Sequence, residues 1–519
     1  MPQPGPDSVS SVAAAGKKNT SESLAAVGVS VLIAYASVRS FFAAASKPFW
    51  YDELLTVILT GQSSLSAVWR ALSQAVDGQP IGFYLIERAA HALTRDPHIA
   101  FRIPSIFAFA CVLLCVFLFV KCRSGAPYAL LCTSMLLLTV AYSTYAVEAR
   151  PYGLLLACIA FALFCYQRAP EPPWLVLLGF SLAFAETLHY YAVFVLFPLG
   201  LAEVAWSLKA RHLRPGAWVA LVCGLLPLAV FWPLLLAQKR YYGTHFWATP
   251  TLRHTGSTYG WLFHVSSYHW NAALALAAML FLLGAAGALA IQRVRAAMIT
   301  DRYFHEYVLA WALLALPFAA FVATKIAHGG FDHKYVLPAV LGIPLSAGYI
   351  LGRLRRRVVV LLAVLVVSVL AVQEARFWVS QRGHLGEVVP PVASLESSVD
   401  LAGHTNLPVV VSDTLDYLTF VYYASPSLAG RLVAVVDPPE EVAYAGTDSL
   451  DRNLARLRLF YPLRVYGFQA FASDHPSFLL YSDGTVNDWW PRRLGDDGYS
   501  LEVVAAEGGR KVYLVTGGR

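Results

Sequence analysis

The feature that most constrains the fold of this chain is a series of long apolar segments separated by short polar turns. A helix of about 20 apolar residues crosses the hydrocarbon core of a bilayer, and shorter helices suffice where the membrane thins or the helix packs in a bundle. Eleven segments meet this requirement, of which the fourth, fifth and eleventh are only 15 residues long. We therefore predict spanning helices at residues 24–45, 103–120, 126–147, 152–166, 174–188, 190–208, 217–237, 271–291, 307–324, 335–351 and 358–372.

Composition supports a membrane protein and argues against a nucleic-acid partner. Of the 519 residues, 57% are apolar and 14% are charged, whereas a soluble domain has about 45–50% and about 25%. The formal net charge is +7, but the basic residues lie in short loops between the apolar segments and form no single patch. We interpret them as topology signals.

The distribution of lysine and arginine tests the partition independently, because these residues accumulate in cytoplasmic loops. Alternate loops carry most of them, whereas the remaining short turns carry chiefly Arg150, Lys325 and Lys334. The N-terminus is therefore predicted to be cytoplasmic and the C-terminus extracytoplasmic. Cleavage after the small residues 43–45 is an alternative fate for the first segment, and it leaves the next loop outside as well. The basic loops contain Lys17, Lys18, Lys121, Arg123, Arg168, Lys209, Arg211, Arg214, Arg293, Arg295, Arg302, Arg353, Arg355, Arg356 and Arg357.

These patterns predict a polytopic α-helical membrane protein with a small C-terminal α/β domain outside the cell. We expect a disordered cytoplasmic tail at residues 1–23 and a membrane domain at residues 24–375. The loop at residues 46–102 alternates apolar and polar runs, as interfacial helices do. Residues 376–519 contain short β-branched runs between turn residues, which predicts the soluble α/β domain.

The ionisable residues that topology leaves unexplained all fall on the predicted outer side of the membrane. Such residues are costly within a bilayer, about 2.5–3.5 kcal/mol at the centre of a helix, so their placement is informative. Carboxylates can accept a proton, and arginine, histidine and lysine can hold an anion. The set comprises Asp52, Glu53, Asp77, Glu148, Arg150, Glu186, His189, Asp332, His333 and Lys334.

Each cluster also has an ordinary structural interpretation. An Asp–Glu pair just past a helix end is more often a cap or solvated surface, and Glu148 with Arg150 makes a local ion pair. A histidine at a membrane interface is usually a satisfied amphipathic side chain, and Lys334 can snorkel from its helix. The functional hypothesis rests on their shared face and on the aromatic side chains around them. No GxxxxGK[ST], HExxH or GxSxG motif occurs, which disfavours a nucleotide-driven pump and an ordinary hydrolase.

Several motifs resemble those of one enzyme family when they are taken in order. They are FWYDELLT after the first segment, DGQPIGFY about 25 residues later, FRIPS before the second segment, EARPYGL after the third and LHYYAVF at the sixth. Together they resemble the GT-C glycosyltransferases, and more narrowly the protein O-mannosyltransferase and aminoarabinose-transferase-like group, glycosyltransferase family 39. The resemblance covers about residues 24–350.

The resemblance implies an enzyme that uses a polyprenyl-phosphate-linked sugar and inverts the anomeric carbon. It assigns catalysis to Asp52 with Glu53 beside it, and it assigns the lipid phosphate to Arg150 and Lys334. The family often has His-Pro-Pro where this chain has Gln79, Pro80 and Ile81, so the acceptor-side role of that loop stays open. Some relatives bind a divalent metal and others do not, and we assign no cofactor. The implied substrate-binding set is Asp77, Gln79, Glu148, Arg150, Tyr152, His189, Tyr190, Asp332, His333, Lys334 and Tyr335.

The sequence therefore predicts a single inverting displacement at the outer edge of a membrane, with Asp52 as the base. The acceptor is a protein, a lipid or a glycan, and the membrane is a bacterial plasma membrane. Two other classes stay open: a transporter or flippase of lipid-linked sugars, and a binding protein that acts through its outer domain.

Overall fold

The computed structural model describes the chain except residues 1–5, 243–244, 264–300, 384, 486 and 518–519. The chain divides into two compact units. The first unit is helical and comprises residues 1–44, 102–230 and 250–385. The second comprises residues 45–101, 231–249 and 386–519, and it contains the β-sheet. The predicted class, a helical membrane protein with a small C-terminal α/β domain, is confirmed.

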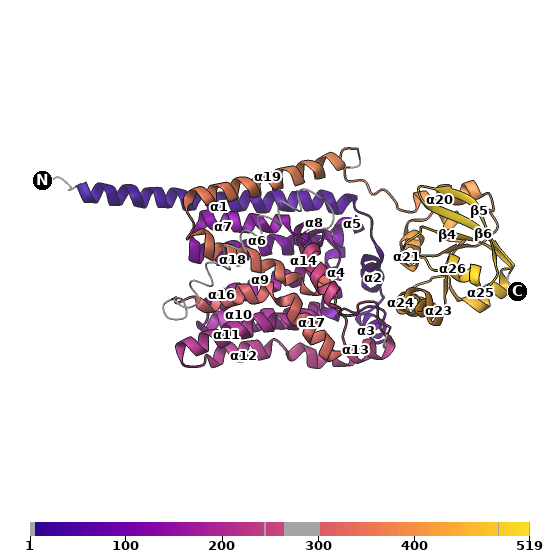
Figure 1. Cartoon of the computed structure of the whole chain (residues 1–519), viewed down its shortest axis with the longest axis horizontal. Coiled ribbons are helices and arrows are strands. Elements are labelled where there is room, and N and C mark those ends of the chain that lie inside the picture. The colour runs from indigo at the N-terminus through magenta and orange to yellow at the C-terminus, as the bar shows by residue number, and fades with distance from the viewer. Residues whose placement is uncertain (1–5, 243–244, 264–300, 384, 486, 518–519) are drawn as a thin grey trace. The chain divides into compact units, whose positions relative to one another are not determined.

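The first unit is a bundle of helices, of which α6 and α9, α9 and α10, and α11 and α16 pack side by side (Figure 1). Its sequences are apolar on every side, as expected of helices that face either neighbouring helices or lipid. The helices are α1 (Pro6–Ser46), α6 (Ile103–Ser124), α7 (Ala126–Ser134), η1 (Met135–Leu138), α8 (Val140–Ser143), η2 (Tyr145–Val147), α9 (Tyr152–Arg168), α10 (Pro172–Leu188), η3 (Tyr190–Val195), α11 (Leu196–Ala210), α12 (Pro215–Cys223), α14 (Leu252–Leu262), α16 (Phe304–Leu314), α17 (Leu316–Ala327), η4 (His333–Leu341), α18 (Gly342–Leu351) and α19 (Arg356–Ser380). Helix α13 (Leu226–Tyr242) begins in this unit, but most of its residues belong to the second.

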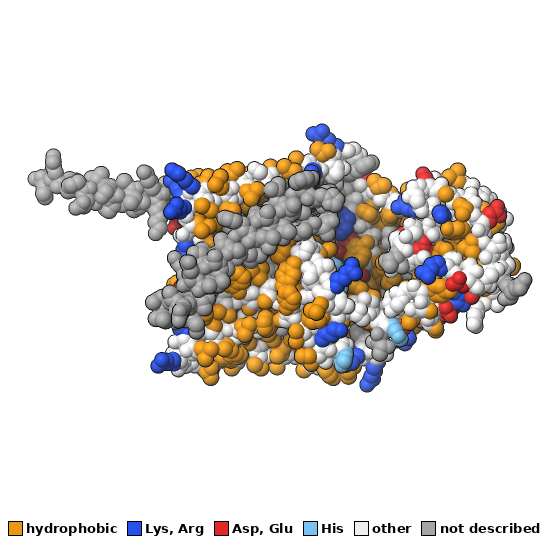
Figure 2. Space-filling model, in the orientation of Figure 1, with side chains coloured by type: hydrophobic (Ala, Val, Ile, Leu, Met, Phe, Trp, Pro, Cys, Tyr) orange, Lys and Arg blue, Asp and Glu red, His pale blue; other side chains and the backbone are white. Residues whose placement is uncertain are grey.

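The helices agree with the predicted spanning segments wherever the structure describes the chain. Within the described residues, six helical segments are long and apolar enough to cross a membrane, and two bent pairs would each add one span. The fourth and fifth segments correspond to the shorter apolar helices α9 and α10. The segment predicted at residues 271–291 lies outside the described residues, so the count of eleven stays a prediction. Hydrophobic side chains dominate the visible face of this unit in Figure 2.

Two predicted spans are bent instead of straight, each by 62°. One bend separates α16 from α17, where Pro317 occupies the first turn of the second helix. Proline has no backbone N–H and clashes with the preceding turn, so a helix that meets it breaks or bends. The other bend lies at Thr139, whose backbone is extended between η1 and α8.

Three boundaries differ from those that the sequence predicted: the start of α1, the end of α19 and the unit to which the first loop belongs. Helix α1 already begins at Pro6, so it includes most of the tail that we expected to be disordered at residues 1–23. Helix α19 runs on to Ser380, beyond the predicted end of the membrane domain at residue 375. The loop at residues 46–102, assigned by sequence to the membrane domain, falls almost entirely within the second unit.

The loops predicted to share the basic side of the membrane do meet at one end of the bundle. Arg123 in the last turn of α6 binds both carboxylate oxygens of Glu306 in α16, at 2.6 and 3.0 Å. Gln167 near the end of α9 donates to the same carboxylate, and Arg353 after α18 lies 3.2 Å from Asp301. The alternation of basic loops therefore reflects a real grouping in space. Which side of the membrane this end faces stays a prediction.

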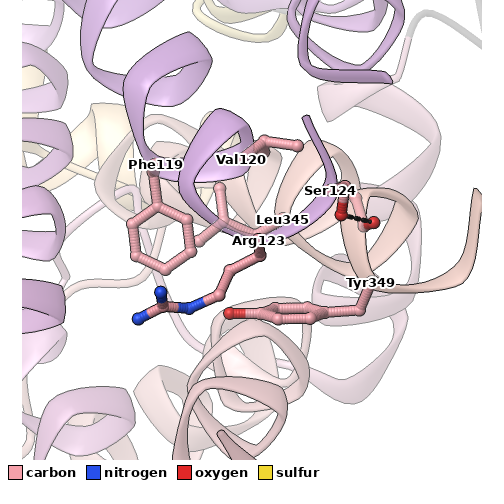
Figure 3. A pocket seen from close by; sticks show the side chains of 7 residues that line it. Phe119, Val120, Arg123, Ser124, Leu345 and Tyr349 are labelled. Atoms are coloured by element: carbon pink, nitrogen blue, oxygen red, sulfur yellow. Dashed lines mark hydrogen bonds between the residues drawn. The ribbon is translucent and has the colours of Figure 1, made fainter. Parts of the chain in front are cut away.

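A small pocket opens at this basic end between α6 and α18 (Figure 3). Phe119, Arg123, Leu345 and Tyr349 are among its lining residues, and the Ser124 hydroxyl donates to the carbonyl of Gly348. The empty space there is about 130 Å³ and includes open solvent. Tyr349 and Arg123 both bind Glu306 here. We interpret the region as a polar contact that joins helices.

The second unit combines short helices from the first loop with a six-stranded sheet. The loop forms α2 (Tyr51–Thr60), α3 (Leu65–Ser73), α4 (Ile81–His91) and α5 (Pro97–Ala100). The remaining helices are α20 (Ala393–Ala402), α21 (Thr414–Tyr423), α22 (Pro426–Ala429), α23 (Pro438–Ala445), α24 (Ser449–Leu457), α25 (Phe468–Asp474) and α26 (Trp490–Asp496). The strands are β1 (Val409–Val411), β2 (Leu432–Val436), β3 (Val465–Gly467), β4 (Ser477–Ser482), β5 (Ser500–Glu507) and β6 (Arg510–Thr516).

The sheet has the order β3-β2-β1-β4-β6-β5. Its first four strands are parallel and are joined by helices, and β4, β6 and β5 pair antiparallel. Strands β1 and β2 are buried throughout, as parallel strands covered on both faces are. Gly508 and Gly509 both have positive φ angles, 57° and 87°, which is the backbone that a two-residue hairpin between β5 and β6 requires.

Candidate functional site

Predicted site residues from three distant parts of the chain meet in the first unit. The ring of His189 lies 5.4 Å from that of Tyr152 and 5.4 Å from that of Tyr335. The ammonium group of Lys334 lies 5.8 Å above the ring of Tyr152. Arg150 and Lys334 are both close enough to His189 for their charges to act on it. We call these five residues the cation–aromatic cluster.

The local sequence explains the positions of Arg150 and Tyr152 in this cluster. Pro151 ends the extended segment that carries Arg150, and α9 begins at the next residue, so Arg150 and Tyr152 stand at the start of that helix. Gly153 lets α9 approach its neighbours, because a Cβ there would lie 2.9 Å from the carbonyl oxygen of Tyr145 and 3.3 Å from the Cβ of Ser105. The Ser105 hydroxyl also donates to the carbonyl of Glu148 at 2.6 Å. The Glu-Ala-Arg-Pro segment is therefore held against α6.

His189 presents a buried N–H group to this cluster. It caps η3, and its Nδ1 accepts the backbone N–H of Tyr191 at 3.1 Å. Because Nδ1 is the acceptor, a neutral ring carries its proton on Nε2. His189 is only 2% exposed, and Nε2 has no hydrogen-bond partner within the described part of the chain. A buried donor without a partner is rare in folded proteins, which marks this position as one where a ligand acceptor would be stabilised.

Asp332 and His333 lie next to the cluster and form a group of their own. Asp332 caps η4 by accepting the backbone N–H of Lys334 at 3.0 Å, and its Oδ1 lies 3.1 Å from Nδ1 of His333. The ring of His333 packs on Trp261 with a centroid distance of 3.5 Å. Their ligand atoms and one of His254 lie within 4.8 Å of one another, the single such group of three found among the described residues.

This second group offers ligand types that suit a divalent metal, but its geometry is already explained without one. Zinc–ligand bonds are about 2.0–2.2 Å, so ligand atoms separated by up to 4.8 Å would have to move closer. Asp332 is engaged by a backbone N–H and by His333, and the ammonium of Lys334 follows in the chain. Asp52, Glu53 and Asp77 form no such group. We therefore interpret Asp332 and His333 as a hydrogen-bonded pair.

Three other predicted residues lie in this unit but are not members of the cation–aromatic cluster. Glu148 is 4% exposed and precedes Arg150 by two residues. Tyr190 follows His189 in η3 and is half-buried. Glu186 is buried one turn before His189 in α10, and its Oε2 has no partner among the described residues.

In the second unit the adjacent acids Asp52 and Glu53 differ in their contacts and in their burial. Asp52 and Glu53 both lie in the first turn of α2, where the helix dipole favours negative charge. Glu53 is fully buried, accepts the backbone N–H of Trp50 at 3.4 Å and lies 3.9 Å from the ammonium of Lys47. Glu53 therefore caps the helix. Asp52 is half-buried, which is the exposure that a proton acceptor needs.

Asp77 and Gln79 form the loop that precedes α4. One oxygen of Asp77 accepts the backbone N–H of Gly78 at 2.7 Å, and the other accepts the hydroxyl of Tyr84 at 2.6 Å. These contacts hold Asp77 as an element of the loop. Gln79 is buried, and its Oε1 has no partner among the described residues. Gln79 is therefore the better placed of the two to meet a ligand donor.

The sequence analysis did not predict two aromatic residues, Tyr191 and Trp261, that pack against the cation–aromatic cluster and the Asp332–His333 pair. Tyr191 stacks on Tyr335 at 4.2 Å and donates to the carbonyl of Gly330 at 2.7 Å. Trp261 contacts both Tyr145, at 5.6 Å, and His333. Tyr191 lies in the LHYYAVF motif, so the sequence did contain a signal for it. Trp261 had none, because tryptophan is common in membrane proteins.

The fold of the chain, a bundle of apolar helices together with a sheet domain, is similar to a GT-C glycosyltransferase fold, as the sequence motifs predicted. No protein-family model and no curated protein sequence matches the chain, so the likeness is one of structure. The chain is similar to ArnT from Cupriavidus metallidurans in the apo state, with a TM-score of 0.55 and 13% identity over 95% of this chain and 100% of that one. It is also similar to the same protein bound to undecaprenyl phosphate, with a TM-score of 0.51, 15% identity and the same coverage.

Proposed function

We propose that this chain is an integral membrane glycosyltransferase that moves a sugar from a polyprenyl-phosphate donor to an acceptor hydroxyl, with inversion at the anomeric carbon. The cation–aromatic cluster carries the proposal. It places a guanidinium, an ammonium and the N–H of His189 together in a buried setting, where such groups stabilise a phosphate strongly.

The structural relatives support the choice of donor. ArnT, whose fold the chain shares, has been crystallised with undecaprenyl phosphate. A lipid-linked donor also agrees with the composition of the first unit, whose helices are apolar on the faces that lipid would cover. In this proposal the site faces the outside of a bacterial plasma membrane, with the N-terminus in the cytoplasm.

The reaction is a single displacement. The acceptor oxygen attacks the anomeric carbon, the bond from that carbon to the phosphate oxygen breaks, and the acceptor proton passes to the carboxylate of Asp52. Polyprenyl phosphate leaves with the bonding electrons, and Arg150, Lys334 and the Nε2–H of His189 stabilise its charge. The aromatic rings of Tyr152 and Tyr335 form apolar walls beside these donors.

Asp52→Asn tests the assigned base, because it keeps the size of the side chain and removes its ability to accept a proton. We expect cells with this variant to lose the transferred sugar from surface glycans and to accumulate the lipid-linked sugar, as measured by mass spectrometry. Asp96→Asn is the matched control: Asp96 caps α5 in the same unit, and asparagine caps equally well. Wild-type surface glycans in the Asp52→Asn cells, at wild-type protein abundance, would show that the base is wrong.

A detergent assay separates this function from a transporter or flippase of lipid-linked sugars. In micelles there are no two sides, so transport cannot be scored, whereas sugar transfer continues. We expect purified protein to release undecaprenyl phosphate from the lipid-linked sugar that accumulates in the Asp52→Asn cells, when an envelope extract of the same cells supplies the unmodified acceptor.

A further inference from the structure

The second unit is assembled from three separate stretches of the chain, and one asparagine joins all of them. Asn453 lies in α24 of the C-terminal domain and is 8% exposed. Its side-chain oxygen accepts the hydroxyl of Tyr51 at 2.6 Å. Its side-chain nitrogen donates to the carbonyl of Val76 at 2.7 Å and to the hydroxyl of Tyr242 at 2.8 Å. All the hydrogen-bonding groups of this amide except one lone pair are therefore engaged.

Two of these partners immediately precede predicted site acids. Tyr51 is followed by Asp52, and Val76 is followed by Asp77. Each acid is therefore one residue away in the chain from a group that Asn453 holds. Burial, chiefly, raises the pKa of Tyr51 well above 10, which keeps its hydroxyl protonated as the donor to Asn453.

Helix α24 is itself held firmly to the sheet domain. The buried Asp451 accepts the backbone N–H of Asp437 at 2.6 Å, and its own N–H donates to Glu441 at 3.1 Å. These contacts tie α24 to the end of β2 and to α23. On the other side, the Tyr241 hydroxyl donates to the carbonyl of Arg452 at 2.8 Å. Asn453 is thus a fixed point on a supported helix, which is what a group must be if it is to hold another in place.

We propose that Asn453 is a positioning residue for sugar transfer, which sets the acid-bearing starts of α2 and of the loop before α4 through Tyr51 and Val76. The inference rests on the proposed function, and it gives the C-terminal domain a direct part in the reaction. A base acts only in the transition state, so its misplacement lowers kcat and leaves donor binding unchanged.

Two substitutions remove different halves of the contact. Tyr51→Phe deletes one hydroxyl and keeps the ring. Asn453→Asp keeps the acceptor for Tyr51 but loses both N–H donors and presents a carboxylate to the Val76 carbonyl. Gln62→Leu is the matched control, because Gln62 also links the end of α2 to the C-terminal domain, by donating to the Phe460 carbonyl at 3.1 Å, yet it adjoins neither acid.

The experiment uses the full-length protein in detergent and measures three quantities for each variant. They are the melting temperature, the binding of undecaprenyl phosphate, and the kcat and donor KM for release of undecaprenyl phosphate from the lipid-linked sugar that the Asp52→Asn cells accumulate, with an envelope extract of those cells as the source of acceptor. Since a misplacement of about 1 Å can cost about 100-fold in rate, we expect kcat to fall roughly 10-fold in Tyr51→Phe and roughly 100-fold in Asn453→Asp. Undecaprenyl phosphate binding, the donor KM and every property of Gln62→Leu should stay within about twofold.

A purely structural contact would give a different result. The folded fraction of Tyr51→Phe would then turn over at the rate of Gln62→Leu, and that outcome overturns the inference. If Asn453→Asp fails to fold, the milder Tyr51→Phe decides the question alone. An inactive Asp52→Asn together with a fully active Tyr51→Phe refutes only the role of Asn453, whereas an active Asp52→Asn refutes the proposed function itself.

Discussion

Gly153 offers the sharpest test of how the cation–aromatic cluster is built. A methyl group at this position would lie 2.9 Å from the Tyr145 carbonyl oxygen, whereas ordinary contacts begin near 3.4 Å. The start of α9 would have to move by the difference, 0.5 Å, away from η2. The obstructing atom belongs to the backbone, so no side-chain rotation relieves the contact, and such overpacking costs about 1–3 kcal/mol.

The displacement should reach the cation–aromatic cluster, because Arg150 and Tyr152 lie within three residues of Gly153 at the start of α9. A shift of this size would weaken the contacts of both residues with a bound phosphate, and we expect a loss of roughly tenfold in undecaprenyl phosphate affinity, or about 1.4 kcal/mol. We expect Gly153→Ala to melt roughly 2–10 °C lower than the wild type and to bind undecaprenyl phosphate roughly tenfold more weakly. Fluorescence melting and native mass spectrometry of the purified protein measure the two effects.

Gly200→Ala is the control for this experiment. Gly200 lies within α11, and a Cβ there would meet nothing within 4 Å. Alanine is the better helix former by about 0.5–1 kcal/mol, so this variant should be at least as stable as the wild type and bind the lipid normally. Equal stability and equal binding in the two variants would refute the argument that Gly153 sets the position of Arg150.

Two further predictions concern charge. Arg150→Lys keeps the charge but loses the paired N–H groups, so it should weaken undecaprenyl phosphate binding about tenfold, whereas Arg168→Lys at the far end of α9 should bind as the wild type does, and equal affinities would contradict the role of Arg150. In the sheet domain, burial and the neighbouring Asp413 raise the pKa of Asp416 to about 7. The folded chain thus holds this proton more tightly than the unfolded chain, and the resulting stability is complete below about pH 4 and is lost as pH rises toward 7. Asp416→Asn should therefore melt higher than the wild type at about pH 8 and no higher at about pH 4, and a constant difference at both pH values would contradict this assignment.

The membrane part of the fold was predictable because the bilayer imposes one simple rule on every spanning helix. Length and apolarity located the helices, and the basic residues Arg123 and Arg353 do lie in polar contacts at one end of the bundle, whereas the side of the membrane that this end faces stays a prediction. The bends were harder to see. Pro317 gives a local signal for one of them, but Thr139 gives none, since threonine is found in many intact helices.

The structure brings several of the predicted site residues together, but their function stays a prediction, and their individual contacts could not be read from the sequence. Spacing alone could not show that Glu53 caps α2 while Asp52 stays half-buried, because both are acidic residues in a first helical turn. The contacts of Asn453 could not be predicted from the sequence, for another reason. Its contacts join residues 402 and 377 positions apart, and an amide in an amphipathic helix carries no mark of its distant partners.

The span of 402 residues between Tyr51 and Asn453 also has a consequence for the synthesis of the protein. A ribosome adds about 5–20 residues per second, so the segment that carries Asp52 emerges about 20–80 s before the helix that holds it. During that interval the early loop is an incomplete structure that exposes apolar surface. A nascent chain stalled before residue 449 would thus be a natural client for chaperones, and full-length chains would become active only after release.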